Sequence, residues 1–287
     1  MNFRFFSTYC LPVLSKVLTR RILTATTVTS IIIDGLIYYC FLADSSNSIM
    51  ALGTTHTNEV ISMKHKFQIS ESIRLGAILA LSGGFMDAYS YMERGEVFAN
   101  AQTGNMLLFG VHLSEGDFQN TMKYLFPVLA FALGIALAEV VRAKAGNLLH
   151  WRQISVLAEA LILIAVSFFP TALNLPANAL TSFACGIQVE SFRKIHGKGI
   201  ATTMCIGNLR SGTENLHHYF HTKERHFLDT SLLYYGIIAC FIVGAVIGNA
   251  AVQLFQIKAI LGCSFLLLIS FFMMFIDWEK KEKELAL

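Results

Sequence analysis

The sequence has few charged residues for its length. Charged residues make up 14% of the 287 residues, whereas hydrophobic residues make up 54%. An ordinary soluble domain carries about 25% charged residues, so these side chains are too few to cover a soluble surface. The 23 phenylalanines and the mean hydropathy of +0.56 put the apolar excess into side chains that need burial. Because a lipid bilayer buries such side chains, the composition predicts a membrane protein with the bilayer as its partner.

Several kinds of site also lack their sequence signatures. The net charge of +3 is too small an imbalance for a nucleic-acid-binding surface. The six cysteines are scattered singly and form no CxxC pair, which argues against disulfides and metal sites. The sequence contains no phosphate-binding glycine loop, no HExxH and no GxSxG. We therefore expect no enzymatic activity, no metal ion, no cofactor and no nucleic-acid partner.

Six apolar segments come close to the length of about 20 residues that a spanning helix requires. These segments are residues 73–92, 124–141, 154–173, 177–192, 231–255 and 259–276. Two shorter segments, residues 97–113 and 200–216, each carry a Gly-Asn pair among Thr, Asn or Gln. Lipid does not satisfy such polar groups, so we expect both short segments to be re-entrant.

The positive charges favour this arrangement of six spans. With both short segments re-entrant, fifteen Lys and Arg residues lie on one side of the membrane, and only Arg94, Lys123 and Lys258 lie on the other. Cytoplasmic loops carry the excess of Lys and Arg, so the C-terminus is expected in the cytoplasm. If both short segments crossed the membrane instead, the charges would favour no orientation.

The order of these parts occurs twice. A shift of 103 residues places Gly104-Asn105 on Gly207-Asn208 and Asp87 on Glu190, and FALG at residues 131–134 resembles FIVG at residues 241–244. Each unit has three spans, and this odd number makes the second unit enter the membrane from the opposite side. We predict an all-α polytopic fold of two inverted three-helix repeats, with two non-helical elements near the midplane. The predicted divisions are an N-terminal extension (1–62), the repeats (63–175 and 176–278) and a charged cytoplasmic tail (279–287).

Two carboxylates stand at matching places in the repeats. Asp87 lies inside the first span, where an unpaired carboxylate costs several kcal/mol, so it is expected to face the protein interior and a solute pathway. The alternative is that Asp87 only caps the re-entrant segment. Glu190 is the matching candidate in the second unit, and its alternative is a surface ion pair with Arg193 or Lys194.

The short segments bring hydroxyl and amide groups into an apolar context. Such groups can replace the hydration of a small polar or ionic solute, although they can also serve only to hold the loops in shape. The predicted substrate-binding residues are Asp87, Asn100, Thr103, Gly104, Asn105, Gln188, Glu190, Thr202, Thr203, Gly207 and Asn208.

Two further patterns have structural explanations. The histidines of HHYFHTKERH, from His217 to His226, suit a solvated, pH-sensitive cytoplasmic loop better than a metal site. Gly244 and Gly248 form a GxxxG in the fifth span, which promotes close helix contact within the molecule or between two copies in a homo-oligomer.

The segments GGFMDAYSY, VFANAQTGNMLLFG and ATTMCIGNLRSGTE resemble the YoaK family of bacterial inner-membrane proteins, over about residues 70 to 277. The resemblance implies a helical membrane domain of about six spans in the bacterial inner (plasma) membrane, with a transport role whose substrate is unassigned. Ile206 stands where a Thr is common in the family, which speaks against a symmetric use of two Thr hydroxyls. Starts at Met50 or Met63 would give a chain typical of the family, so we expect the product to begin at one of them.

These observations together predict a transporter or channel for a small polar solute or ion. In this interpretation Asp87 and the two Gly-Asn segments line the path. The alternative is a non-transporting membrane scaffold or regulatory subunit, in which the polar segments only stabilise the fold.

Overall fold

The computed structural model describes residues 72–145, 150–195 and 197–285, which all belong to one compact unit, Lys64–Leu287. The predicted extension of residues 1–62 and the expected starts at Met50 and Met63 lie outside the described residues. In chain order the elements are α3 (Ile73–Glu93), α4 (Gln102–Glu115), α5 (Phe118–Ala145), α6 (His150–Val166), η4 (Thr171–Leu173), α7 (Asn174–Ser191), β1 (Lys194–Ile195), β2 (Lys198–Gly199), α8 (Cys205–Thr222), α9 (Arg225–Phe255), η5 (Gln256–Ile260) and α10 (Leu261–Leu285).

The described residues are almost entirely helical, which confirms the all-α prediction. The strands β1 and β2 form only a two-residue antiparallel hairpin, in which Lys194 pairs with Gly199. Among the described residues, two stretches are long and apolar enough to cross a membrane, Phe118–Lys144 and Arg225–Phe275, with mean hydropathies of 2.1 and 2.2. The second stretch runs through α9, η5 and α10, so these two stretches contain three of the six predicted spans.

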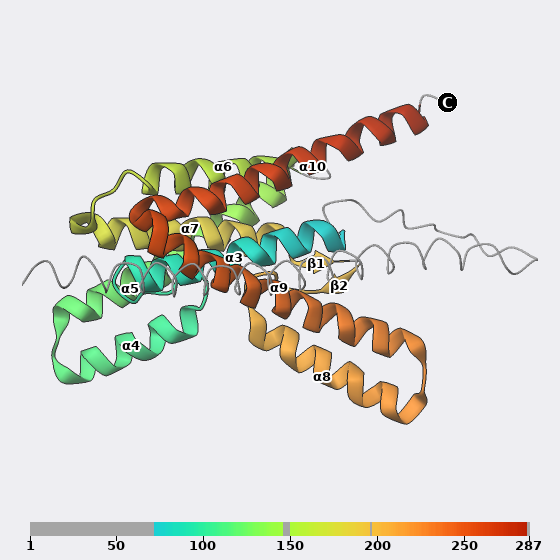
Figure 1. The fold of residues 1–287 in the computed structure, drawn as a ribbon, viewed down its shortest axis with the longest axis horizontal. Coiled ribbons are helices and arrows are strands. Elements are labelled where there is room, and N and C mark those ends of the chain that lie inside the picture. Colours follow the sequence, from blue (N-terminus) through green and yellow to red (C-terminus); the bar gives the residue numbers. More distant parts are fainter. Residues whose placement is uncertain (1–71, 146–149, 196, 286–287) are drawn as a thin grey trace, which may run out of the picture. The chain divides into compact units, whose positions relative to one another are not determined.

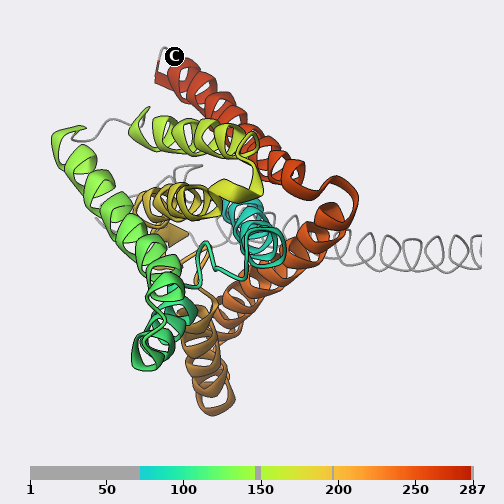
Figure 2. The ribbon, with the colours of Figure 1, turned by 90° about the vertical axis from the view of Figure 1, so that its left-hand side faces the viewer.

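Helix packing follows two pairs and two hairpins. The two pairs are α3 with α9 and α5 with α7, and α6 also packs against α10. Helix α4 turns back onto α5 and helix α8 turns back onto α9, and Figure 1 shows these two hairpins diverging from the centre of the unit. The view in Figure 2 shows α5 beside α7 and α3 beside α9.

Glycines bring the backbones of each helix pair into close contact. A Cβ on Gly84 of α3 would overlap the carbonyl oxygen of Phe241 on α9, and a Cβ on Gly244 of α9 would overlap the carbonyl oxygen of Leu81. The pair α5 and α7 has the same reciprocal contacts, in which Gly134 faces the carbonyl of Phe183 and Gly186 faces the carbonyl of Phe131. Gly248 also faces the α3 backbone, at Phe85. The GxxxG of α9 therefore serves a contact within the molecule.

Two local predictions are corrected by the structure. The Gly-Asn pairs at 104–105 and 207–208 lie in the first turn of α4 and α8, and the non-helical chain is the stretch that precedes each helix. Asn105 and Asn208 fix these helix starts by bonding to backbone seven residues earlier, as described below. The histidines at 217, 218 and 221 lie on α8 and not in a loop, because the chain stays helical up to Thr222.

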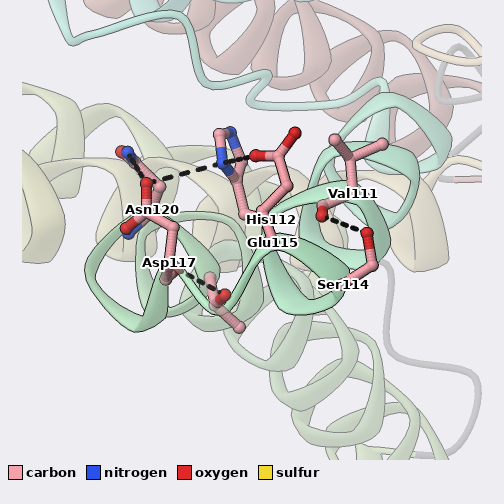
Figure 3. A network of polar contacts seen from close by, with 7 residues as sticks. Val111, His112, Ser114, Glu115, Asp117 and Asn120 are labelled. Carbon is pink, nitrogen blue, oxygen red and sulfur yellow. Dashed lines mark hydrogen bonds and ion pairs between the residues drawn. The ribbon is translucent and has the colours of Figure 1, made fainter.

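The turn between α4 and α5 is closed by local polar contacts (Figure 3). Gly116 takes a left-handed conformation (φ 72°), and the amide of Asp117 donates to the carbonyl of His112 at 3.0 Å. The Asp117 carboxylate accepts from the Asn120 side chain at 2.7 Å and from the Asn120 amide at 3.1 Å. These two hydrogen bonds hold the pKa of Asp117 below its ordinary value.

Arg94 fastens the end of α3 to neighbouring elements. Its side chain is 1% exposed and donates to the Tyr89 hydroxyl at 2.8 Å. It also donates to the carbonyls of Val166 and Pro170, at 2.9 and 3.4 Å, and to the Asn174 side chain at 3.1 Å. A buried guanidinium is stable here because carbonyl oxygens near the C-terminus of α6 accept its hydrogen bonds.

Candidate functional site

A cavity of about 1410 Å³ lies where the two helix pairs and the two hairpins meet. Its walls come from α3, α5, α7 and α9 and from the beginnings of α4 and α8. Six of the eleven predicted substrate-binding residues line it, namely Asp87, Asn100, Thr103, Thr203, Gly207 and Asn208. The two halves of the chain therefore contribute to one cavity, with the Gly-Asn segments on its wall.

Asp87 connects the middle of α3 to the chain that leads into α4. Its carboxylate accepts a hydrogen bond from the amide of Asn100 at 2.7 Å, and the amides of Ala99 and Ala101 also face it. The Asn100 side chain donates to the carbonyl of Gly83 at 3.2 Å. The carboxylate thus holds the chain that leads into α4, which is the capping role given as the alternative for Asp87, and Asp87 also lines the cavity.

Asn105 and Asn208 hold equivalent positions in the two halves. The Asn105 amide nitrogen donates to the carbonyl of Phe98 at 2.7 Å, and its oxygen accepts from the Phe98 amide at 3.0 Å. The Asn208 amide nitrogen donates to the carbonyl of Ala201, also at 2.7 Å. Each side chain closes the stretch that leads into its helix, so the repeated Gly-Asn signal has a structural origin.

Five predicted residues lie outside the cavity wall, namely Gly104, Asn105, Gln188, Glu190 and Thr202. Gly104 packs against the ring of Phe98, where a Cβ would lie 2.7 Å from the nearest ring carbon. Gln188 is fully buried, and its amide nitrogen donates to Oε1 of Glu159 at 2.6 Å when the amide is assigned to face that acceptor. The Thr202 hydroxyl lies 3.4 Å from the same amide group. Gln188 therefore provides a polar contact for a buried acid of α6, and Thr202 contacts Gln188.

Glu190 forms the ion pair that was its alternative interpretation. Its carboxylate lies 3.2 Å from the Arg193 guanidinium and 3.8 Å from that of Arg142. Arg142 also pairs with Glu139 of its own helix. This group of charges lies near the end of α7; Arg193 is part of the described cavity wall, whereas Glu190 is not.

Three buried polar atoms on the cavity wall have no hydrogen-bond partner among the described residues. They are Oδ1 of Asn100, Oγ1 of Thr203 and Oδ1 of Asn249. An unpartnered buried polar atom costs about 1–3 kcal/mol, which a bound water or solute can recover. Asn249 was not predicted, although an amide within the apolar segment 231–255 is the same kind of signal that identified Asp87.

The rest of the wall is mainly apolar. Aromatic rings of Phe98, Phe131 and Phe241 line the cavity together with Ile135 and Met106. The polar atoms are therefore a small part of the lining, which is the usual composition of a site that takes an organic molecule. The arrangement can desolvate an apolar body while it offers hydrogen bonds to a polar group.

Comparison with known proteins agrees with the membrane character that the composition predicts. Residues 75–273 match the family model described as Protein of unknown function (DUF1275). The chain is 29% identical over 182 residues to the UPF0700 transmembrane protein YoaK of Bacillus subtilis (strain 168), an alignment that covers 60% of this chain and 80% of that protein. No solved structure matches the chain.

Proposed function

Because the chain belongs to the DUF1275 family, whose function is unknown, we propose from its cavity that it is an integral membrane transporter or channel for a small polar solute. The observation that carries the proposal is the cavity of about 1410 Å³ with unpartnered polar atoms of Asn100, Thr203 and Asn249 on its wall. A cavity of this kind between helices is a common place for a solute site.

The proposal includes six spans in two inverted repeats. The helix packing supports two repeats, because α3 of the first repeat packs on α9 of the second in the same way as α7 of the second packs on α5 of the first. The glycine contacts at Gly84 and Gly244 correspond in the same way to those at Gly186 and Gly134. In this topology the spans are α3, α5, α6, α7, α9 and α10. The first repeat comprises residues 63–175, and the second comprises residues 176–278.

We further propose that the chain leading into α4, and the chain leading into α8, are re-entrant from opposite faces. The bond between Asn100 and Asp87 supports this, since it places the start of α4 beside the interior of α3. Helices α4 and α8 would then act as half-helices whose amino ends meet at the cavity. We also propose that the C-terminus lies on the cytoplasmic side of the bacterial inner membrane, because the excess of Lys and Arg favours that orientation.

The scaffold alternative has less support. A GxxxG of α9 that recruits a partner would support a scaffold, but Gly244 and Gly248 pack against the α3 backbone. The polar atoms on the cavity wall also exceed what is needed to hold the helix starts, because Oγ1 of Thr203 and Oδ1 of Asn249 bond to no described residue.

A cavity-blocking variant tests the proposal. Ala132 of α5 lines the cavity, whereas Ala136 lies one turn further along the same helix, is exposed and is not in the described wall. Purified protein in proteoliposomes would be screened with a mixed pool of polar metabolites, and uptake measured by mass spectrometry. We expect Ala132→Trp to abolish uptake of the transported solute and Ala136→Trp to retain it. Equal uptake by the two variants, or no uptake by the unaltered chain, would overturn the transport proposal.

A further inference from the structure

The beginnings of α4 and α8 differ in one respect that bears on the solute. At α4 the carboxylate of Asp87 accepts from the amide of Asn100 and faces the amides of Ala99 and Ala101. The amino end of a helix carries unpaired N–H groups and partial positive charge, so a carboxylate is stabilised there. The α4 end therefore already has an anion supplied by the chain.

Among the described residues, the corresponding place at α8 has no carboxylate of its own, and the carboxylate that acts electrostatically on Cys205, the first residue of α8, is that of Asp87. The reciprocal glycine contacts match Gly84 on α3 with Gly186 on α7, and Asp87 follows the first by three residues. The residue three positions after Gly186 is Val189, and Val189 lines the cavity. The shift of 103 residues had matched Asp87 with Glu190, but Glu190 is engaged with Arg193.

Donor groups at the α8 end are available to a ligand. The cap residue Met204 is extended (φ −121°, ψ 98°), and its side chain caps no amide of this 18-residue helix. Thr203, directly before it, lines the cavity with 2% exposure, and its hydroxyl has no partner among the residues that the structure describes. Helix amides together with a hydroxyl are a donor set that binds an oxyanion.

The remaining wall indicates the body of the ligand. Phe131, Ile135 and Phe241 line a space of about 1410 Å³, which is far larger than an inorganic anion requires. Burial of an apolar group against such side chains favours binding in proportion to the apolar area removed from water. A molecule with a carboxylate on an aromatic or aliphatic body suits both the donor groups at the α8 end and the apolar remainder of the wall.

We infer that the α8 end of the cavity binds the carboxylate of an organic anion with an apolar body, received by the α8 amides and the Thr203 hydroxyl. This inference rests on the proposed function, because it names the class of solute for the same cavity. Asp87 of the chain supplies the carboxylate at the amino end of α4, and the bound solute supplies a carboxylate at the amino end of α8.

Binding of radiolabelled benzoate to the purified full chain in detergent tests the inference. We expect saturable binding of benzoate that is competed by unlabelled benzoate and not by benzamide or benzylamine, which keep the ring and lose the charge or reverse it. Thr203→Val is expected to weaken benzoate binding about tenfold, the effect of one hydrogen bond to a charged group, and Thr203→Ser is expected to restore it. Val189→Asp is expected to abolish binding, because it places a carboxylate where the α8 end lacks one.

Thr181→Val is the matched control. Thr181 is a buried threonine of α7 whose hydroxyl donates to the carbonyl of Ala177 at 2.8 Å, and it is not in the described cavity wall. Each variant is first compared with the unaltered chain by thermal unfolding, so that loss of fold is separated from loss of binding. Absence of saturable benzoate binding, equal competition by benzamide, or equal affinities of the Thr203→Val and Thr181→Val variants would overturn the inference.

The same experiment distinguishes this inference from the transport proposal. Benzoate that binds with the expected variant pattern, but is not taken up by proteoliposomes, supports the anion site and counts against transport. Uptake of a neutral or cationic solute that Ala132→Trp blocks, without benzoate binding, supports transport and overturns the anion site.

Discussion

A single methyl group on Gly84 tests whether backbone contact between α3 and α9 determines stability. The Cβ of Gly84→Ala would lie 2.8 Å from the carbonyl carbon of Phe241 and 2.9 Å from the amide nitrogen of Ala245. Ordinary van der Waals contacts of a Cβ begin at 3.4 Å. Because both neighbouring atoms belong to the backbone of α9, no side-chain rotation relieves the contact, and the helices must separate by about 0.5–1 Å.

The expected cost follows from two opposing effects. Overpacking of a well-packed interface costs about 1–3 kcal/mol, whereas alanine stabilises a helix interior by about 1 kcal/mol relative to glycine. Gly236 of α9 provides the control, because its Cβ would meet no atom of the described chain within 4 Å. Gly236→Ala should therefore keep the helix gain alone. The difference in free energy of unfolding between the two variants isolates the clash, at about 1–3 kcal/mol.

Unfolding in a detergent and SDS titration, followed by circular dichroism, measures this difference. We expect Gly84→Ala to unfold at lower SDS than the unaltered chain and Gly236→Ala to unfold at the same or higher SDS. Gly186→Ala, at the other helix pair, should lose a similar amount, and the two losses should add because the sites share no neighbour. Equal stability of Gly84→Ala and Gly236→Ala would refute the argument that the glycines set the helix spacing.

Three further outcomes are expected. Arg94→Ala should lower the free energy of unfolding by about 3 kcal/mol or more, because it leaves several buried acceptors without a donor; SDS titration measures it, and a change under 1 kcal/mol would contradict the role of Arg94. The lowered pKa of Asp117 means that its contribution to stability is present above its ordinary pKa of 3.8 and is lost as pH falls through the lowered value. Asp117→Asn should therefore flatten the dependence of melting temperature on pH below about 4. An unchanged pH profile would count against a stabilising role of the Asp117 carboxylate. In a chain whose own cysteines are replaced, an impermeant maleimide should label Glu224→Cys only from the cytoplasmic side and Glu115→Cys only from the other side, whereas labelling of both from one side would exclude opposite entry of the hairpins.

Helices were predictable from the sequence where the length of an apolar segment alone sets their extent. The segment 73–92 became α3, Ile73–Glu93, with the Ser72 hydroxyl capping its first turn. The segment 154–173 was predicted too long, because α6 ends at Val166 and a separate 3-10 turn begins after Pro170. Proline has no amide to donate and disfavours a helical residue before it, so Pro170 was the signal for that end.

The site was predictable only in part, because side-chain direction has no signature in a helix that is apolar all round. Asp87 stood out as an acid in an apolar run and does line the cavity. Gln188 comes from the same kind of run and faces Glu159 in the interior instead. An amphipathic pattern would have separated the two faces, but α7 and α9 are apolar on their exposed faces too, as at Leu175, Ile242 and Val246, and Asn249 was missed for the same reason.

The repeats themselves indicate which polar residues serve the fold and which are free for a ligand. A role that occurs in both repeats has to meet a requirement that both share, and Asn105 and Asn208 each close the chain seven residues before them. A position that differs between repeats is released from that shared requirement. Asp87 fills the α4 end with a carboxylate while Val189 leaves the α8 end without one, and the unpartnered hydroxyl of Thr203 stands on that second side. This asymmetry is the reason for our proposal that the solute binds in the α8 half of the cavity, although the sequence signal was equally strong in both halves of the chain.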